Sequence, residues 1–446
     1  MDSKLGITLI FIFSLIGFSS LEGKEWRLSL KEALELAEKR TITLQLAQMD
    51  VEEGDATVRE AYASAMPSIS LNGVIGRYFI APETYIPAFH MRVKFFPTND
   101  ITSQVAFQQP IWLGGRVGLA LQAAKVYRQL ARFNLQAEKS RVKSSVIREY
   151  FGLSLSRQLV KLMEESYEQA ERHRQIAEEF YQQGLISQYD LLRAQTAVKS
   201  LEPEVERARQ VALLAETTLK QRLGFPSSER IIPLDSLAEP DQSETLPISL
   251  ALERAYEQRP EFRVADLNFR LREIALKVEE RSIYWPNFFL NIHYQWRVAE
   301  DRFRDIAPPR WSNEFRGQVV MSLPLFDGWA TSARVQKAKL GLRRAYLQKE
   351  QLSNGVELEI TQVLSELQRA QKQVESQKVA LKLAEKAYQI ALERYEQGVG
   401  TELEVQDARL ARDKARLGYL QGLYDLRVAQ AEYQRSVSGD HDLGDV

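Results

Sequence analysis

The stretch Ala177-Glu-Glu-Phe-Tyr-Gln-Gln-Gly184, followed by Asp190-Leu-Leu-Arg-Ala194, decides the fold because the chain contains it twice. It returns as Ala391-Leu-Glu-Arg-Tyr-Glu-Gln-Gly398, followed by Glu404-Val-Gln-Asp-Ala408, and the second glycine lies 214 positions after the first. Five of the eight residues in the first segment are identical in both copies. Each copy ends in a glycine between two helical patterns, which is where a helix is expected to stop and the chain to turn back.

The chain is therefore predicted to build one architecture twice. The period is far longer than the roughly 20–50 residues of a solenoid unit, and 446 residues leave room for two large copies. We predict a first repeat over residues 24–226, a second over residues 248–438, and a C-terminal tail over 439–446. Between the repeats, residues 227–247 are rich in proline and are expected to form an irregular connector lying against the helices.

Composition and charge narrow the class of protein. Lys and Arg number 59 against 60 Asp and Glu, so the net charge is −1 and the pI is about 6.5. A chain of this balance has no basic surface for nucleic acid, and we expect no such partner. The absence of cysteine excludes disulfides, thiolate metal sites, a cysteine nucleophile and an acylated N-terminal cysteine. We expect no metal site and no cofactor.

Residues 1–23 are predicted to be a secretory signal peptide. Lys4 supplies the positive start, residues 5–18 are apolar, and small residues up to Gly23 follow. The alternative is a membrane anchor, but an apolar run of 14 residues is shorter than the roughly 20 that span a bilayer. No later apolar run is long enough for a membrane-spanning helix. An exported chain of this kind is expected to be soluble or to form a β-barrel.

The first repeat is expected to begin with an amphipathic helix from Ser29 to about residue 66. Ser29 is the expected N-cap, and Glu32 three residues later completes a capping box. Pro67 ends the helical pattern. From Ile69 the period changes to two, because apolar and polar residues alternate, and this indicates a β-strand.

A strand–loop–strand hairpin is predicted over residues 67–112. Residues 81–99, between the two alternating runs, contain three prolines and several aromatic residues and are expected to be irregular. Pro110 is expected to close the second strand, because proline cannot donate to a β-ladder. Gly114 and Gly115 are expected to turn the chain into the next helix.

The second repeat follows the same order. A helix is expected from Ile248, and Pro286 corresponds to Pro67 at the start of a second hairpin over residues 286–326. Its second strand is expected to carry its apolar face on to Leu323 and Leu325, with Pro324 in the place of Pro110. Gly328, which follows an aspartate, makes the turn into the next helix.

Long helices are predicted between these hairpins and the two glycine turns. Residues 116–182 would measure about 100 Å as one continuous helix. Apolar residues in the returning helix, 187–223, are spaced alternately three and four apart, and the second copy shows the same spacing over 360–395. A repeat of 3.5 residues predicts coiled-coil packing with a left-handed supercoil. The helical hairpins are expected to turn at residues 184–188 and 398–402.

The alternating strands carry most of the functional information. Each is about 10–12 residues long, close to the length of a strand that crosses a bilayer, and has one apolar and one polar face. The alternative is an antiparallel sheet packed on a soluble core, although the helical seams are occupied by helix packing. Four strands cannot close a membrane barrel, since the smallest has about eight. Several copies must therefore pool their strands, and the physical argument leaves eight or twelve open.

These residues resemble the TolC-like outer membrane efflux proteins, the channel-tunnels of bacterial efflux and type I secretion systems. The resemblance rests on Ser29-Leu-Lys-Glu-Ala-Leu34, Met66-Pro-Ser-Ile69, Pro110-Ile-Trp-Leu-Gly-Gly115-Arg116, Pro324-Leu-Phe-Asp-Gly328 and the two Tyr-x-Gln-Gly turns. It implies an α+β membrane protein that forms a homotrimer. Three chains would pool their strands into a twelve-stranded β-barrel in the outer membrane, continued across the periplasm by a long coiled-coil α-helical barrel.

The resemblance also implies partners and a path. The chain would be a passive exit duct in contact with outer-membrane lipid, fed by an inner-membrane transporter through a periplasmic adaptor, or membrane fusion protein. Its substrates would be small molecules, as in multidrug efflux, or, as the alternative, proteins exported by type I secretion. The turns at Gly184, Gly398 and Gly400 would form the tip where the tunnel closes and the adaptor docks.

The family's gate residues fall on particular positions of this chain. Two acidic residues six and nine positions after the turn glycine correspond to Glu404 and Asp407, and three copies around an axis would repel anions and attract cations. An interhelical latch corresponds to Asp190 and Tyr395. The family's latch arginine is replaced by Gly400, which weakens the expected latch. The alternative for these charges is an ordinary solvated helix surface.

No catalytic arrangement is expected. The sequence has no H-E-x-x-H, G-x-S-x-G or G-x-x-x-x-G-K motif, and the resemblance implies that the chain is not an enzyme. Surface positions are expected for its four scattered histidines: His90, His173, His293 and His441. The methionines do not cluster, so nothing indicates copper handling. The hypothesis from another class is an exported coiled-coil scaffold or adhesin, whose four alternating segments would form a soluble sheet.

Overall fold

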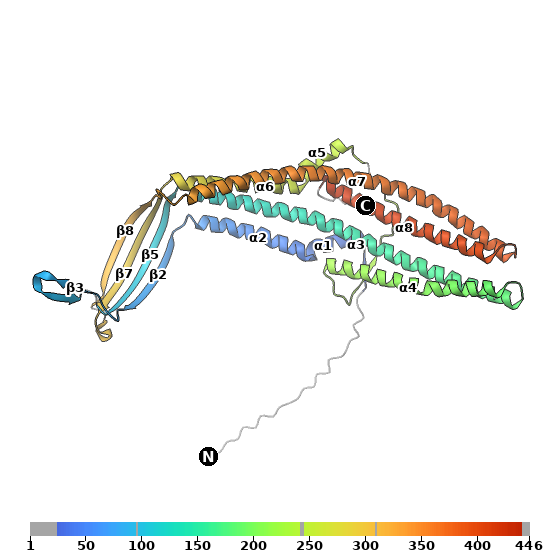
Figure 1. Ribbon diagram of the computed structural model, residues 1–446, viewed down its shortest axis with the longest axis horizontal. Coiled ribbons are helices and arrows are strands. Elements are labelled where there is room, and N and C mark those ends of the chain that lie inside the picture. Colours follow the sequence, from blue (N-terminus) through green and yellow to red (C-terminus); the bar gives the residue numbers. More distant parts are fainter. Residues whose placement is uncertain (1–24, 95–96, 241–244, 308–309, 439–446) are drawn as a thin grey trace, which may run out of the picture.

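The computed structural model describes residues 25–94, 97–240, 245–307 and 310–438. The expected signal peptide at 1–23 and the expected tail at 439–446 lie outside the described residues. The molecule is elongated, with a β-sheet at one end and long paired helices that reach to the opposite end (Figure 1).

Four strands form one antiparallel sheet in the order β2-β5-β7-β8. Their bounds are Ser68–Arg77 for β2, Asn99–Leu113 for β5, Asn287–Glu300 for β7 and Ser312–Ser322 for β8. The first two strands come from the first repeat and the last two from the second, so the β5–β7 pairing joins the repeats. Within the described part of the chain, β2 and β8 each pair on one side only.

The strand register confirms the predicted alternation across the whole sheet. One row of residues that lie opposite one another is apolar: Leu71, Val105, Tyr294 and Phe315. The neighbouring row, one residue along each strand, is polar: Asn72, Gln104, Gln295 and Glu314. Because successive side chains of a strand point to opposite sides, the sheet has one apolar and one polar face.

Pro110 does not end its strand, contrary to the sequence expectation. β5 continues to Leu113, and its register against β7 shifts between Pro110 and Trp112. A bulge of this kind accommodates a residue that has no N–H to donate, so the ladder resumes beyond the proline.

Two further expectations for the hairpins are corrected by the structure. Residues 81–99 are not wholly irregular, because β3 (Glu83–Ile86) and β4 (Met91–Lys94) pair as a short antiparallel ribbon that projects from the end of the sheet (Figure 1). β8 ends at Ser322 and does not reach Leu325. Its last residue pairs with Asn287, the first residue of β7, so no partner remains for a longer strand.

Eight helices make up most of the described chain. The capping box of Ser29 and Glu32 is present at the first of them and confirms that start. Their bounds are Leu30–Arg40 (α1), Ile42–Ala63 (α2), Arg116–Gln182 (α3), Gln188–Leu223 (α4), Ile248–Gln258 (α5), Pro260–Tyr284 (α6), Ala330–Glu396 (α7) and Glu402–Ser438 (α8).

The order of the helices repeats the order of the strands. In the half next to the sheet, α2 contacts α3, α3 contacts α6 and α6 contacts α7 (Figure 1). In the far half, α3 contacts α4 and α8, and α8 also contacts α7. The two longest helices, α3 and α7, have 67 residues each and run through both halves.

The predicted seams are confirmed as the buried faces of the helical hairpins. In α4 the buried apolar residues of the stripe are Ala194, Val198, Val205, Leu219 and Leu223. In α7 they are Ile360, Leu367, Ala370, Val374, Ala391 and Tyr395. This spacing fits coiled-coil packing of α4 on α3 and of α7 on α8. None of the described helices is long and apolar enough to cross a membrane.

The connector is more ordered than the sequence indicated. Within residues 227–247, β6 (Arg230–Pro233) pairs in parallel with β1 (Glu25–Leu28). The buried hydroxyl of Tyr150 on α3 donates to the carbonyl of the last residue of β1 at 2.8 Å and accepts from the backbone N–H of Asp235 at 3.1 Å. Pairing with β1 satisfies backbone groups of β6. The hydrogen bond between Asp235 and Tyr150 attaches the connector to α3, as expected.

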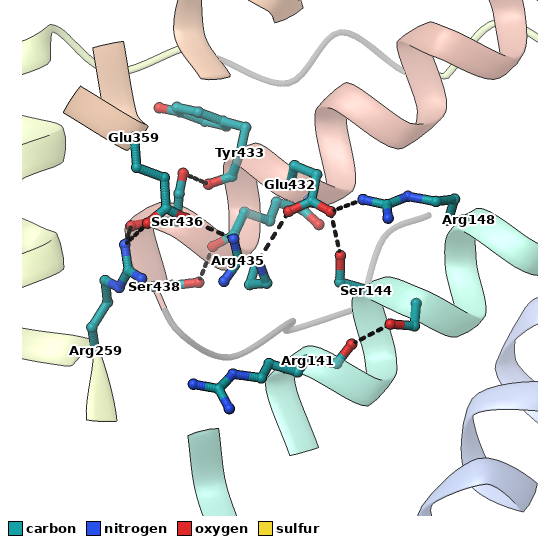
Figure 2. Close-up of polar contacts among 12 residues, drawn as sticks. Arg141, Ser144, Arg148, Arg259, Glu359, Glu432, Tyr433, Arg435, Ser436 and Ser438 are labelled. Atoms are coloured by element: carbon teal, nitrogen blue, oxygen red, sulfur yellow. Dashed lines mark hydrogen bonds and ion pairs between the residues drawn. The ribbon is translucent and has the colours of Figure 1, made fainter. Parts of the chain in front are cut away.

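A charged network joins four helices in the middle of the molecule (Figure 2). Glu432 on α8 accepts from Arg148 on α3 and from Arg435, whose Nε lies 2.9 Å away. Arg435 also donates to Glu359 on α7 at 2.6 Å, and Arg259, between α5 and α6, donates to the same carboxylate at 3.0 Å. Burial alone would raise the pKa of Glu432, but its hydrogen bonds with Arg435 and Ser144 outweigh burial and lower it.

Removing Arg259 should break this network at its most buried member. Its side chain is 4% exposed and also donates to the carbonyl of Ser436. We expect Arg259→Ala to destabilise the protein by about 3–5 kcal/mol, because Glu359 loses a buried partner. Thermal unfolding measures the loss, and Arg254→Ala, an exposed residue of the same region, should change stability by less than about 0.5 kcal/mol. Equal effects of the two variants would contradict a stabilising network.

The two faces of the sheet should respond oppositely to a positive charge. Val105 and Gln104 are neighbours on β5 and point to the apolar and the polar face. If the apolar face meets lipid, Val105→Arg should cost about 2–4 kcal/mol near the bilayer centre and reduce the amount of assembled protein in the membrane fraction. Gln104→Arg is the matched control and should assemble normally. Normal assembly of both variants would contradict a lipid-facing sheet.

Candidate functional site at the tip of the helical hairpins

The end of the molecule farthest from the sheet is formed by two helical hairpins (Figure 1). We call this end the tip. The first hairpin turns from α3 into α4 between Gln182 and Gln188, and the second turns from α7 into α8 between Glu396 and Glu402. All the residues that the family resemblance assigns to gating lie here.

The two turns have the same backbone geometry. Gly184 and Gly398 both have a φ of 73°, a left-handed conformation that glycine adopts without strain. The residue after each glycine donates its N–H to the carbonyl five positions back: Leu185 to Phe180 at 2.8 Å and Val399 to Arg394 at 3.0 Å. These bonds are those of a Schellman motif, so the repeated Tyr-x-Gln-Gly sequence is a helix stop.

Gly400 is required by a close backbone approach. A Cβ atom at this position would lie 2.9 Å from the backbone nitrogen of Tyr395 and 3.1 Å from the carbonyl carbon of Arg394. Position 400, at which the resemblance implies a latch arginine, is therefore packed against α7. This accounts physically for the departure noted in the sequence.

Glu404 and Asp407 both lie on the exposed side of α8, one turn apart. The Glu404 side chain is 45% exposed, and its carboxylate lies 3.9 Å from the guanidinium of Arg394 on α7. Because both side chains are exposed in the single chain, they are free to face the axis of a trimer. That these residues form an acidic ring stays a prediction.

Asp190 and Tyr395 are not hydrogen-bonded to each other in this conformation. Asp190 completes a capping box with Ser187 at the start of α4, where the serine hydroxyl donates to its carboxylate at 2.6 Å. The Tyr395 side chain is buried, and its hydroxyl has no hydrogen-bond partner among the described residues. The latch between these two residues stays a prediction for other states of the tip.

The buried neighbours of Tyr395 are two residues that the sequence analysis did not single out. His173 on α3 has its ring centroid 4.8 Å from that of Tyr395, in an edge-on arrangement. Its Nε2 atom lies 3.2 Å from a carboxylate oxygen of Glu402, the first residue of α8. The expectation of a surface position for His173 is wrong, because its side chain is 12% exposed and that of Glu402 only 4%.

Burial sets the ionisation of this cluster. It raises the pKa of Glu402 above the usual value, although the charges of His173 and Arg409 and a hydrogen bond from Gln406 act in the opposite direction. Burial also raises the pKa of Tyr395 to about 12, and the negative charge of Glu402 adds to this increase. The tip thus contains a carboxyl group that holds its proton more strongly than an exposed glutamate does.

A signal for this cluster was present in the sequence. On α3 the buried residues Ser166, Ala170 and Ala177, with the partly buried His173 between the last two, are spaced alternately four and three apart. On α8 the buried Glu402 and Val405 continue the same kind of stripe. Following the 3.5-residue repeat into these two helices would have placed a histidine and a glutamate in a helical seam, where ionisable groups are uncommon.

The contact between the two hairpins combines apolar packing with several polar side-chain pairs. Along the α3–α8 interface, successive turns of α3 bond to α8 through side chains: Arg416 to Glu165 at 2.8 Å, Ser166 to Asp413 at 2.9 Å and Arg412 to Gln169 at 2.8 Å. The seams within each hairpin, by contrast, bury apolar residues. Polar contacts exchange readily for water, so the hairpins can separate from each other more easily than either can unfold.

The predicted junction residues lie where strands meet helices at the opposite end. Gly114 and Gly115, with φ of 62° and 72°, lead from β5 into α3, and Gly328, with φ of 67°, precedes α7. A Cβ at Gly114 would lie 2.7 Å from the Cβ of Trp285, so a side chain there is excluded by both conformation and space. The other predicted junction residues are Pro67, next to β2, Pro286, next to β7, Pro110, inside β5, and Pro324, beyond β8.

No group of three or more His, Cys, Asp or Glu side chains in the described parts of the chain could hold a metal ion. His293 lies on the polar face of β7, 3.9 Å from Glu314, and His90 contacts the hydroxyl of Tyr85 at 3.2 Å. His441 lies outside the described residues. At the tip, His173 and Glu402 form a group of only two such side chains.

A two-faced sheet continued by long paired helices with a polar contact at their far end defines a channel subunit. The sequence model of the family described as outer membrane efflux protein matches residues 33–225 and 251–437. The chain belongs to this family. It is accordingly a passive channel protein of the outer membrane that extends into the periplasm, and not an enzyme.

Individual relatives agree with this assignment. The chain is 26% identical over 350 residues to the cobalt-zinc-cadmium resistance protein CzcC of Cupriavidus metallidurans, which covers 77% of both proteins. It is 26% identical over 385 residues to Protein CyaE of Bordetella pertussis, covering 86% of this chain and 78% of that protein. The crystal structure of the Campylobacter jejuni CmeC outer membrane channel has the same fold, with a TM-score of 0.77 at 18% identity over 92% of this chain and 85% of that one.

A side chain at Gly400 should loosen the tip. We expect Gly400→Ala to cost about 1–3 kcal/mol, because the added methyl group meets the backbone of α7. Native-state hydrogen exchange at residues 395–402 should detect faster opening. Gly355→Ala, inside α7 with no heavy atom within 4 Å of the added Cβ, should instead stabilise the helix by roughly 0.5–1 kcal/mol. Unchanged exchange at the tip in Gly400→Ala would contradict the close approach.

Proposed function

We propose that three copies of the chain form a passive exit duct with a twelve-stranded barrel and a helical tunnel. The observation that carries this proposal is the pair of open edges of the sheet. β2 and β8 each have ten or more residues and one unpaired side, and an unsatisfied backbone group in lipid costs several kcal/mol, roughly 2–7. Pairing β8 of one copy with β2 of the next removes both edges.

The helices support the same closure. Apolar side chains are exposed on both outer sides of the subunit: Leu46 on α2 and Leu214 on α4 at one side, and Leu383 on α7 at the other. These residues are 56%, 67% and 64% exposed in the isolated chain. Burying such residues against a neighbouring copy is favourable at about 25 cal/mol per Å². Neighbouring copies would thus meet along the whole length of the subunit.

The tip is the proposed gate and docking site. An inner-membrane transporter supplies the energy, and a periplasmic adaptor docks around the turns at Gly184 and Gly398. In the closed state Glu404 and Asp407 of three copies ring the entrance, and opening separates the second hairpin from the first along the polar α3–α8 contact. Asp190 and Tyr395 are proposed to latch the hairpins in the fully closed state.

Small-molecule efflux is the proposed activity, and type I protein secretion is the second candidate. Similarity to a cobalt-zinc-cadmium resistance protein supports export of small solutes. The described side chains provide no cluster that would hold a metal ion, so we place substrate selection in the transporter and not in the duct. Comparable similarity to Protein CyaE is the reason for keeping type I protein secretion as the second candidate.

Single-channel conductance in planar bilayers tests the proposed duct and its gate together. Purified wild-type trimer should show small, cation-selective openings, because a ring of carboxylates attracts cations. Substituting both Glu404 and Asp407 by Ala should enlarge the openings and weaken the cation selectivity. The matched control replaces Glu396, an exposed carboxylate beside the same turn, by Ala and should leave both properties unchanged.

Two outcomes would count against the proposal in different ways. Conductance that the double substitution does not alter would keep the duct and remove the acidic ring as its gate. A folded protein that stays monomeric and never enters the bilayer would overturn the duct itself, since the open strand edges would then have no partner.

A further inference from the structure

His173 and Glu402 meet where four helices converge at the tip. The cleft around them is lined by Ala170 of α3, Ala194 and Ala197 of α4, and residues of α8 that include Gln406 and Arg409. One carboxylate oxygen of Glu402 accepts from Gln406 at 2.7 Å. The other lies 3.2 Å from Nε2 of His173, and neither of these two atoms makes a hydrogen bond of good geometry with the described residues. Two ionisable groups therefore face each other in a cleft that alanines of α3 and α4 line on one side and Gln406 and Arg409 of α8 on the other.

The buried pair is electrically neutral only when the two side chains hold one proton between them. With the proton on Glu402, the carboxyl group donates to Nε2 of His173; with the proton on His173, Nε2 donates to the carboxylate. In both arrangements the pair has no net charge. Without the proton, the Nε2–H tautomer of the neutral imidazole still donates to the carboxylate, but the pair then carries a net negative charge, which burial disfavours.

We propose that His173 and Glu402 form a proton-dependent lock between the two tip hairpins. One shared proton holds α8 against α3, and loss of that proton as the pH rises releases the contact. The lock rests on the proposed function, in which the tip opens by separating the hairpins. It differs from the acidic ring and from the latch, because both of its members are buried within one subunit.

The charges that face the pair come from the other helices as well as its own. Arg409, one turn beyond Val405 on α8, favours the ionised form of Glu402, and its Nε atom has no hydrogen-bond partner among the described residues. From α7, the hydroxyl of Tyr395 faces Glu402 and acts to lower the pKa of its carboxyl group, and on α4 the negative charge of Asp190 acts on the same tyrosine. The positive charge of Arg409 thus opposes the rise in the pKa of Glu402, but burial outweighs this charge.

The direction of the pH effect follows from linkage. The pKa of Glu402 is raised above that of an exposed glutamate, so the closed pair still holds one proton at a pH where exposed glutamate and histidine side chains have both lost theirs. This contribution is fully present below the ordinary pKa of glutamate and disappears as the pH rises through the raised pKa of Glu402. Acidification therefore closes the tip and alkalinisation loosens it.

A single engineered cysteine can report this opening, because the chain has none of its own. Ala194 lines the cleft and is 2% exposed. We would form trimers of Ala194→Cys and measure the rate of maleimide labelling between pH 5.5 and 8, each rate divided by that of the unfolded chain at the same pH. Ala124→Cys, a 5% exposed position on α3 near the sheet, controls for general loosening.

The normalised rate at position 194 should rise with pH and level off above the raised pKa of Glu402, where the closed tip no longer holds the extra proton. Adding Glu402→Gln should keep the rate low at every pH, because the amide is neutral and can donate to His173. Adding Glu396→Gln makes the same chemical change on an exposed residue of the tip and should leave the pH profile unchanged. The rate at position 124 should not depend on pH.

A second variant keeps the test decisive if Glu402→Gln does not assemble. In His173→Gln the amide donates to the carboxylate without needing the shared proton, so the rise in labelling should shift to higher pH or vanish. A role in packing alone would change the rate equally at all pH values. A flat profile in the parent protein, or a profile that neither variant alters, would overturn the lock. Failure of the duct would appear separately, as absent conductance in trimers whose labelling still follows pH.

Discussion

The pairing of β5 with β7 is the contact on which the arrangement of the whole chain depends. It joins one hairpin from each repeat into a single sheet and leaves β2 and β8 at its two edges. Each strand connects directly to a helix, so the strand order is passed on to α2, α3, α6 and α7. Two copies of one sequence unit thereby give a subunit with two different and complementary sides.

The helical part combines two kinds of interface with different strengths. Within a hairpin, α4 on α3 and α7 on α8 bury apolar seams, which water cannot replace. Between the hairpins, α3 and α8 meet through ion pairs and hydrogen bonds as well as apolar contacts, and water replaces the polar part at little cost in free energy. In the middle of the molecule α3, α7 and α8 also share an apolar core, which lies beside the charged network around Glu432 and Arg259. Movement at the tip can therefore occur while the middle stays fixed.

Most of the fold could be predicted because the sequence contains strong periodic patterns. Alternation fixed the faces of four strands, the 3.5-residue repeat fixed the seams, and the two glycine turns fixed where α3 and α7 stop. The errors arose where tertiary context decides: a bulge lets β5 pass Pro110, and pairing with β1 orders part of the connector. Such pairings join segments that are distant in sequence, and no local pattern reports them.

The tip shows the same division between local and tertiary information. Gly184 and Gly398 were predictable because a left-handed helix stop requires glycine locally. His173 and Glu402 were missed because each looks like an ordinary charged or polar residue in a solvated helix. Only the packing of α3 against α8, which depends on residues 229 positions apart, brings them together. A resemblance to known channels could not supply them either, since the matched positions concern the exposed gate.

The equal length of α3 and α7 has a consequence for how such a chain can vary. Each helix has 67 residues, so both hairpins end at the same height and the rim of the subunit is level. An insertion in one helix alone would raise one turn above the other and shift its seam around the helix axis. A tunnel of this design can change its length only by whole heptads, added to both repeats and to both arms of each hairpin together.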